Sequence, residues 1–138
     1  MQGRSFFQLT PVFLYSVAPS SCHGTDVNNL VDKKCQPCEG GVEPLTVEQA
    51  QVLMSQIHPD WTLSADALSI GRYFEFRAFS RTIAFVNAVA FVATNEGHHP
   101  ELVVNYGSCQ VNFTTTAING LSDNDFICAA KIDRLAAQ

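Results

Sequence analysis

The chain has 138 residues, a length that fits one domain able to bury a core without disulfides or metals. Its hydrophobic content of 46% supports a globular fold, while a formal charge of −5 with only eight Lys and Arg argues against nucleic-acid binding. The longest apolar stretch, residues 83–94, is far shorter than the roughly 20 residues that a membrane helix needs. We therefore expect a soluble, cytoplasmic protein that binds neither nucleic acid nor a membrane.

The N-terminal part, residues 1–42, shows no sustained periodicity. An apolar patch behind Arg4 is reminiscent of a targeting sequence, but Pro11 interrupts it and no convincing cleavage site follows, so targeting is the less favoured interpretation. A Ser-, Gly-, Asp- and Asn-rich stretch at 20–29 predicts a flexible linker. We interpret residues 1–42 as a flexible N-terminal extension that contains a CxxC segment, and residues 43–138 as the folded domain. The CxxC segment is expected to be dispensable for folding of the domain.

The chain contains five cysteines, an odd number that is more typical of reduced thiols than of a disulfide framework. Cys35 and Cys38 form a CxxC motif within the extension, for which structural zinc or a redox pair is the specific interpretation. The only further ligand candidates nearby, Cys22 and His23, are adjacent and give poor tetrahedral spacing, and a thioredoxin-like context is absent. Metal binding is therefore the less favoured alternative, and no metal site is predicted.

The regular part of the chain begins at Thr46, which forms a predicted capping box with Gln49 and starts a helix over residues 47–57. Alternating apolar residues then predict a hairpin of strands 61–63 and 68–76. Ser80 can cap a second helix over residues 81–96. Because apolar residues surround that helix almost completely, we expect the sheet to cover one face and a partner subunit to cover another.

A second hairpin is predicted from strands 102–106 and 109–115, in which Cys109 is an apolar core residue. Ser122 and Asp125 then predict a capping box for a last helix that ends near residue 135 and contains Cys128 in an apolar setting. The order is helix, strand, strand, helix, strand, strand, helix. It predicts a two-layer α+β domain with a four-stranded antiparallel sheet and three helices on one face.

The most informative stretch for function is Gly97-His98-His99-Pro100-Glu101. Histidine can both donate and accept a proton near neutral pH, so an adjacent pair at the mouth of a strand points to proton transfer. Two adjacent histidines alone are weak support, because such pairs also occur on ordinary surfaces. Tyr106 follows on an alternating run, and the segments 120–126 and 129–133 come after it.

Together these motifs resemble the pterin-4a-carbinolamine dehydratase family over residues 44–135. The resemblance implies the same α+β fold, a homodimer or homotetramer, and elimination of water from a 4a-hydroxytetrahydropterin without a metal or an organic cofactor. His98 and His99 would be the catalytic pair, His98 transferring the proton and His99 chiefly binding substrate. Pro100 would set their direction and Glu101 would line the rim.

Two positions depart from the family pattern. Thr116 stands where the family's third active-site histidine would align, and Thr94 stands where a charged residue or histidine is usual. A threonine hydroxyl can bind substrate but is too weakly acidic to act as a general acid, and losing such a group costs about 10² to 10⁴ in rate. Asp125 matches an acidic position of the family, but the capping box already accounts for it, so we interpret it as structural first.

Two functions therefore stay open. The first is a dehydratase acting on a pterin, weakened by Thr116, and the second is a non-catalytic relative that assists RuBisCO assembly and is associated with carboxysomes. His98, His99 and Pro100 favour the enzyme, whereas Thr94 and Thr116 favour the assembly factor.

Overall fold

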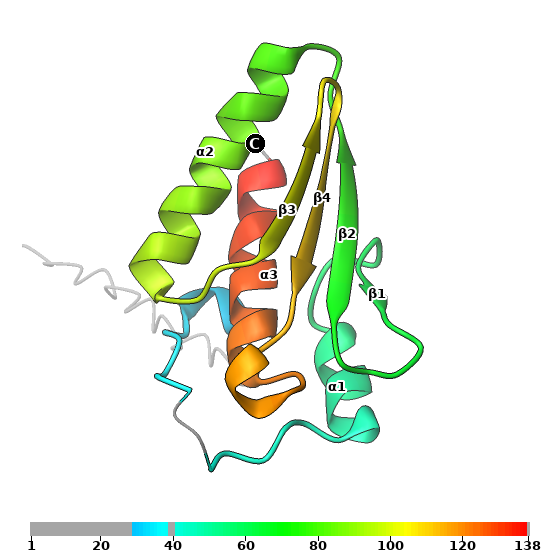
Figure 1. Ribbon diagram of the computed structural model, residues 1–138, viewed down its shortest axis with the longest axis vertical. Helices are drawn as coiled ribbons and strands as arrows, with labels where there is room; N and C mark the ends of the chain where they lie inside the picture. Colours follow the sequence, from blue (N-terminus) through cyan, green and yellow to red (C-terminus); the bar gives the residue numbers. More distant parts are fainter. Residues whose placement is uncertain (1–28, 39–40, 138) are drawn as a thin grey trace, which may run out of the picture.

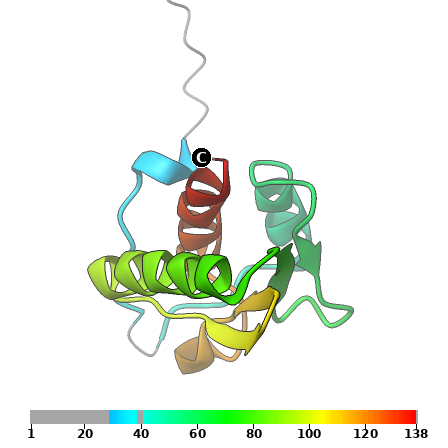
Figure 2. The same cartoon turned by 90° about the horizontal axis from the view of Figure 1, so that it is seen from above.

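The computed structural model describes residues 29–38 and 41–137 (Figure 1). The elements follow in the order η1 (Leu30–Asp32), α1 (Val47–Met54), β1 (Thr62–Leu63), β2 (Ile70–Glu75), α2 (Phe79–Glu96), β3 (Glu101–Asn105), β4 (Ser108–Phe113), η2 (Thr116–Ile118) and α3 (Asp123–Ala136). The four strands form one antiparallel sheet in the order β1-β2-β4-β3, and the three α-helices lie together beside it (Figure 2). The predicted α+β fold is confirmed.

The sheet follows from the alternation of side chains along β2 and β4. In β2, Ile70, Arg72 and Phe74 are buried and the residues between them are more exposed. In β4, which pairs with both β2 and β3, the residues Cys109, Val111 and Phe113 are completely buried. One face of the sheet therefore packs under the helices, as a period of two requires.

The ends of two helices differ from the sequence prediction. Helix α2 begins at Phe79 with Ala78 as its N-cap, so Ser80 lies inside the helix instead of capping it. The buried Thr82 hydroxyl donates to the Tyr106 carbonyl at 2.9 Å, and this contact ties the first turn to the β3–β4 hairpin. Helix α1 ends at Met54 because residues 55–57 continue as a tighter turn before Pro59, a residue that disfavours helix in the position preceding it.

Residues 29–38 form part of the packed structure. Leu30, in η1, is 3% exposed and belongs to the hydrophobic core, and η1 packs against α3. The flexible extension that was expected up to residue 42 therefore does not describe this segment, because burial of an apolar side chain holds it on the domain. The linker predicted at 20–29 and the residues Cys22 and His23 lie outside the described residues, apart from Asn29 at its end.

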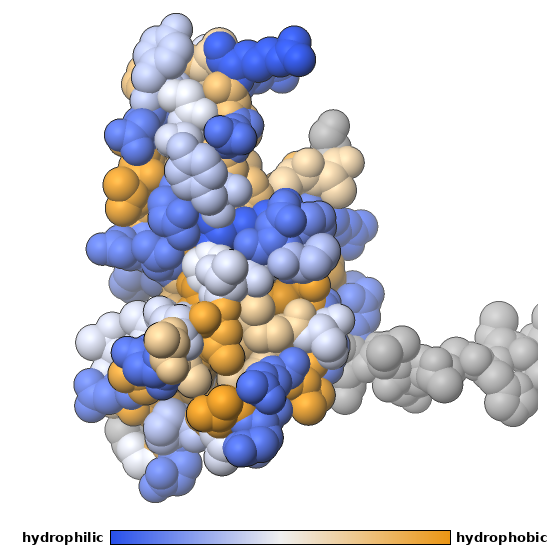
Figure 3. All heavy atoms as spheres, turned by 90° about the vertical axis from the view of Figure 1, so that its right-hand side faces the viewer, coloured by the Kyte–Doolittle hydropathy of each residue, from blue (hydrophilic) through white to orange (hydrophobic). Residues whose placement is uncertain are grey.

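Several large hydrophobic side chains of the described residues are exposed on the surface. On the side of the molecule presented in Figure 3, apolar side chains lie directly among polar ones. Large exposed hydrophobic residues are Val42, Val47, Val52, Leu68, Tyr73, Phe79, Phe91, Val103, Val104 and Tyr106. The homo-oligomer stays a prediction, and these side chains are candidates for its interface. Among the described residues, no helix is long and apolar enough to cross a membrane.

Candidate functional site

The two histidines lie where the chain leaves α2. Gly97 ends the helix with a φ of 66°, a left-handed conformation that glycine adopts without strain. The backbone N–H of His98 then donates to the Ala93 carbonyl at 3.1 Å, which closes the helix end. Pro100 follows, and β3 begins at Glu101. Local backbone geometry therefore places His98 and His99 in the short connection between α2 and β3.

His98 is held by a buried carboxylate. Its Nε2 lies 2.6 Å from Oδ1 of Asp125, and the His98 side chain is 11% exposed while Asp125 is fully buried. The imidazole also stacks on the Phe113 ring, with the centroids 5.7 Å apart and the planes 10° apart. A carboxylate partner fixes the orientation and the tautomer of an imidazole. The hydrogen bond of the His98 ring is made through Nε2, and among the described residues the other ring nitrogen, Nδ1, has no partner.

Asp125 has two roles in the structure. It forms the predicted capping box with Ser122, whose N–H donates to Asp125 Oδ2 at 2.8 Å. The Thr115 hydroxyl donates its one proton to the same Asp125 oxygen at 2.8 Å. The Thr115 oxygen therefore accepts the hydrogen bond of 2.7 Å that the Ser122 hydroxyl donates. The sequence interpretation assigned Asp125 to helix capping first. The structure adds that the second carboxylate oxygen holds His98.

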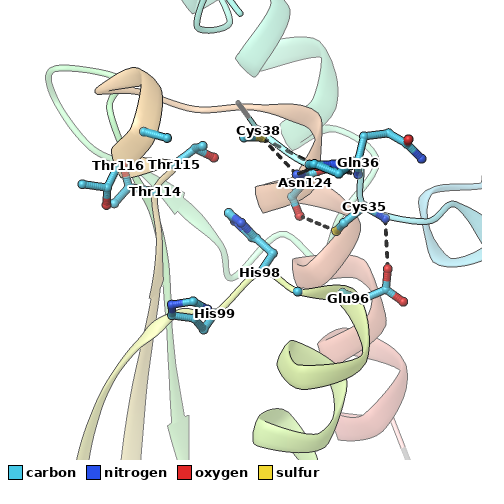
Figure 4. A pocket seen from close by; sticks show the side chains of 13 residues that line it. Cys35, Gln36, Cys38, Glu96, His98, His99, Thr114, Thr115, Thr116 and Asn124 are labelled. Carbon is cyan, nitrogen blue, oxygen red and sulfur yellow. Dashed lines mark hydrogen bonds between the residues drawn. The ribbon is translucent and has the colours of Figure 1, made fainter. Parts of the chain in front are cut away.

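A pocket of about 410 Å³ lies next to this pair. His98, His99 and Thr116 all line it, as Figure 4 shows, and Thr116 comes from η2, directly after the strand that carries Phe113. The pocket is lined in full by Cys35, Gln36, Pro37, Cys38, Glu96, Gly97, His98, His99, Thr114, Thr115, Thr116, Ala117 and Asn124. Its volume is in the range of small-molecule sites.

Pro100 and Glu101 line an adjoining cavity. This second cavity, of about 630 Å³, shares His99, Thr114 and Thr116 with the first. The Glu101 carboxylate accepts a hydrogen bond from Asn112 Nδ2 at 3.0 Å. Thr94 lines neither cavity, and its hydroxyl donates to the Ala90 carbonyl at 2.8 Å. Of the two positions that depart from the family pattern, Thr116 therefore lines the His98 pocket, whereas Thr94 does not.

The CxxC segment, residues 35–38, forms one side of the pocket that contains His98. Figure 4 shows Cys35 and Gln36 on the side away from residues 114–116, with Cys38 and His98 between the two groups. Gln36 N–H donates to Asn124 Oδ1 at 3.0 Å, and Asn124 Nδ2 donates back to the Gln36 carbonyl at 2.6 Å. Cys35 N–H donates to Glu96 Oε2 at 3.0 Å. The CxxC motif is visible in the sequence, but nothing local to it indicates that the segment folds back onto α2 and α3.

The charged and thiol groups behind the pocket are strongly influenced by their surroundings. Burial alone would raise the pKa of Glu96, but hydrogen bonds from Lys131 Nζ at 2.8 Å and from Cys35 N–H outweigh it and hold that pKa at about 2. Cys35 Sγ lies 3.6 Å from Cys128 Sγ, and this hydrogen bond together with burial raises the pKa of Cys128. Glu96 therefore stays charged and Cys128 stays a thiol at neutral pH.

The predicted core cysteines are buried as expected, since Cys109 and Cys128 are both completely inaccessible. Cys35 and Cys38 are half-buried. Within residues 29–38 and 41–137, no group of three or more His, Cys, Asp or Glu side chains is placed to hold a metal ion.

Comparison with known proteins gives concordant matches. The family model described as pterin 4 alpha carbinolamine dehydratase matches residues 43–135. A putative pterin-4-alpha-carbinolamine dehydratase of Nitrosomonas eutropha is 51% identical over 111 residues, which cover 80% of this chain and 96% of the relative. One of Legionella pneumophila (strain Corby) is 48% identical over 108 residues, covering 78% and 96%. Since fewer than 108 residues follow Val42, both matches include part of the segment before residue 43.

Solved structures share the fold. A transcriptional coactivator/pterin dehydratase from Brucella melitensis superposes with a TM-score of 0.64 at 26% identity, over 68% of this chain and 99% of its own. A pterin dehydratase-like protein identified as a RuBisCO assembly factor in the alpha-carboxysome superposes with a TM-score of 0.51 at 21% identity, over 59% of this chain and 94% of its own. At that identity the second likeness concerns the fold alone.

Proposed function

This chain belongs to the pterin 4 alpha carbinolamine dehydratase family, and from that premise we propose that it eliminates water from a 4a-hydroxytetrahydropterin. The observation that carries the proposal is the His98–Asp125 pair beside a pocket of about 410 Å³. Relatives about half identical to this chain are named as putative enzymes of this reaction. No metal and no organic cofactor takes part in the proposed step.

The elimination needs a proton donor and a proton acceptor. The bond from C4a to oxygen breaks, the departing hydroxyl takes up a proton to leave as water, and the pterin ring loses a proton to give the quinonoid dihydropterin. His98 suits this transfer because an imidazole changes its protonation near neutral pH. With Nε2 directed at Asp125, we propose that Nδ1 exchanges the proton with substrate and that Asp125 stabilises the imidazolium formed.

The other predicted residues act by binding. His99 is exposed at the mouth of the pocket and also borders the adjoining cavity, so we assign it to holding the pterin. Pro100 and Glu101 then form the rim through that second cavity. Thr116 contributes a hydroxyl that can hydrogen-bond to substrate but cannot protonate a leaving group at pH 7. We therefore propose a turnover about 10² to 10⁴ below that of relatives with a third histidine.

The test is turnover of a 4a-hydroxytetrahydropterin by the natural chain and by three variants. Thr116→His should raise kcat, because it returns a group of near-neutral pKa to the pocket. His98→Ala should abolish turnover above the uncatalysed rate. His58→Ala, which removes an exposed imidazole outside the pocket, is the matched control and should leave the rate unchanged. A natural chain that is no faster than His98→Ala would contradict the enzymatic proposal.

The alternative is a binding role as a RuBisCO assembly factor, with RuBisCO as partner and an association with carboxysomes. The departure at Thr116 favours it, and the structural neighbour with that role shares the fold. If neither the natural chain nor Thr116→His turns over substrate while both are folded oligomers, the binding role becomes the better proposal. Co-purification with RuBisCO large subunits would then test it directly.

A further inference from the structure

The CxxC segment, residues 35–38, is held on the domain by buried polar side chains. Asn124 is 6% exposed, and its amide oxygen and nitrogen both bond to the Gln36 backbone. The same nitrogen lies 3.1 Å from Cys38 Sγ. A buried amide is costly unless its hydrogen bonds are made. Because the CxxC segment supplies these hydrogen bonds, it is an integral part of the folded domain.

The second attachment is at Glu96, whose side chain is 5% exposed and whose carboxylate accepts from Cys35 N–H at 3.0 Å. Glu96 lies two residues before His98 along the chain, and Asn124 directly precedes Asp125. The segment is thus fastened on both sides of the His98–Asp125 pair. The segment is thereby attached to both elements that carry the His98–Asp125 pair.

Core packing holds only Cys35 of residues 35–38, since Cys35 packs against the hydrophobic core with its Sγ 3.6 Å from Cys128 Sγ. Gln36 and Pro37 are exposed, and Cys38 is only half-buried, whereas the apolar anchor of the segment, Leu30, lies several residues earlier. All four residues of the segment line the His98 pocket. Together with residues 114–117 they line the pocket around His98 (Figure 4). A flat bicyclic ring that must react at one carbon needs a surface on each side to hold it in register.

From these contacts we propose that the CxxC segment is a substrate-contacting wall that determines how tightly the pterin ring is held, and that Asn124 and Glu96 are its positioning residues. The inference rests on the proposed dehydration of a pterin and extends the site to residues outside the matched range 43–135. Cys35 and Cys38 act here as reduced thiols that contact the ring, and their role involves no change of oxidation state.

The first experiment measures protection of the thiols. The full chain is labelled with iodoacetamide with and without 7,8-dihydrobiopterin, a non-reacting pterin whose binding is measured by calorimetry, and labelling of Cys38 is followed by peptide mass spectrometry. At a ligand concentration tenfold above its Kd, labelling should slow about tenfold, because only the free protein exposes the thiol. Binding of dihydrobiopterin without protection of Cys38 would overturn this inference alone. No binding at all would overturn the proposed function and this inference with it.

The second experiment separates binding from chemistry. Asn124→Ala releases the segment and should raise KM about tenfold with kcat changed by less than about threefold, since two hydrogen bonds that hold a binding wall are lost. The variant should also lose the protection of Cys38. Asn87→Ala, an equivalent change at an exposed position of α2, is the control and should behave as the natural chain. A KM within twofold of the natural value in a folded Asn124→Ala variant would contradict the positioning role.

Discussion

The charge of Glu96 should make the stability of this protein depend on pH in a defined window. Its side chain is 5% exposed and its carboxylate accepts from Lys131 Nζ and Cys35 N–H, with Lys34 Nζ at 3.4 Å. These partners hold its pKa at about 2, below the ordinary value of 4.5. Because the pKa is lowered in the folded state, the stabilisation is fully present above pH 4.5 and is lost as the pH falls towards 2.

The size of the effect follows from the displacement of the pKa. A fall from 4.5 to about 2, at 1.36 kcal/mol for each pH unit, corresponds to about 3 kcal/mol of unfolding free energy. Glu96→Gln keeps the shape but removes the charge, so it should lower the unfolding free energy at pH 7 by up to that amount. Between pH 4.5 and 2, the unfolding free energy of the variant should also decline less with falling pH than that of the natural chain, because the variant has no carboxylate at this position to protonate.

The assay is urea unfolding followed by circular dichroism at several pH values from 7 down to 2.5. Glu43→Gln, an exposed carboxylate with no hydrogen bond among the described contacts, is the matched control and should follow the natural curve. If the free energies of the natural chain and Glu96→Gln decline in parallel below pH 4.5, the attribution to Glu96 is wrong. The attachment of residues 35–38 at this carboxylate would then need another explanation.

Three further outcomes are expected. Asp133→Ala should lower the unfolding free energy in urea by about 3 to 5 kcal/mol, because it removes the acceptor shared by Trp61 Nε1 and the nearly buried Arg72; a loss below 1 kcal/mol would contradict this. Leu30→Ala should cost about 2 to 4 kcal/mol in the same assay, and an unchanged midpoint would restore the view that the N-terminal segment is dispensable. Sedimentation at tens of micromolar should show a dimer or tetramer, since residues such as Phe91 are 68% exposed; a monomer would count against it.

The fold could be predicted from the sequence because its determinants are local. The apolar residues Cys109, Val111 and Phe113 occupy every second position, and in the structure all three are buried on one face of the sheet, as the sequence predicts. The capping boxes at Thr46 and Ser122 likewise involve residues three apart, so both were confirmed. Ser80 failed as a cap because the start of α2 is decided by the bond from Thr82 to the β3–β4 hairpin, a tertiary contact that local sequence does not contain.

The site could be predicted only in part, for the same physical reason. His98 and His99 were visible as a motif, and Thr116 was singled out through the family resemblance; all three line one pocket. The bond from His98 to Asp125 spans 27 residues, and the bond from Cys35 to Glu96 spans 61. The periodicity and capping signals used on the sequence do not encode partners at such separations. The wall formed by residues 35–38 was missed because its composition is that of a loop.

The two roles of Asp125 determine which substitutions can test the chemistry. One carboxylate oxygen holds His98, while the other accepts from Ser122 and Thr115 and thereby closes the first turn of α3. A loss of activity on replacing Asp125 would therefore confound catalysis with folding of the helix that also carries Asn124. His98 and Thr116 do not have this double role, because neither side chain caps a helix. The comparison of His98→Ala with Thr116→His is for that reason the decisive one, and activity that rises in the second and vanishes in the first could not arise from altered stability alone.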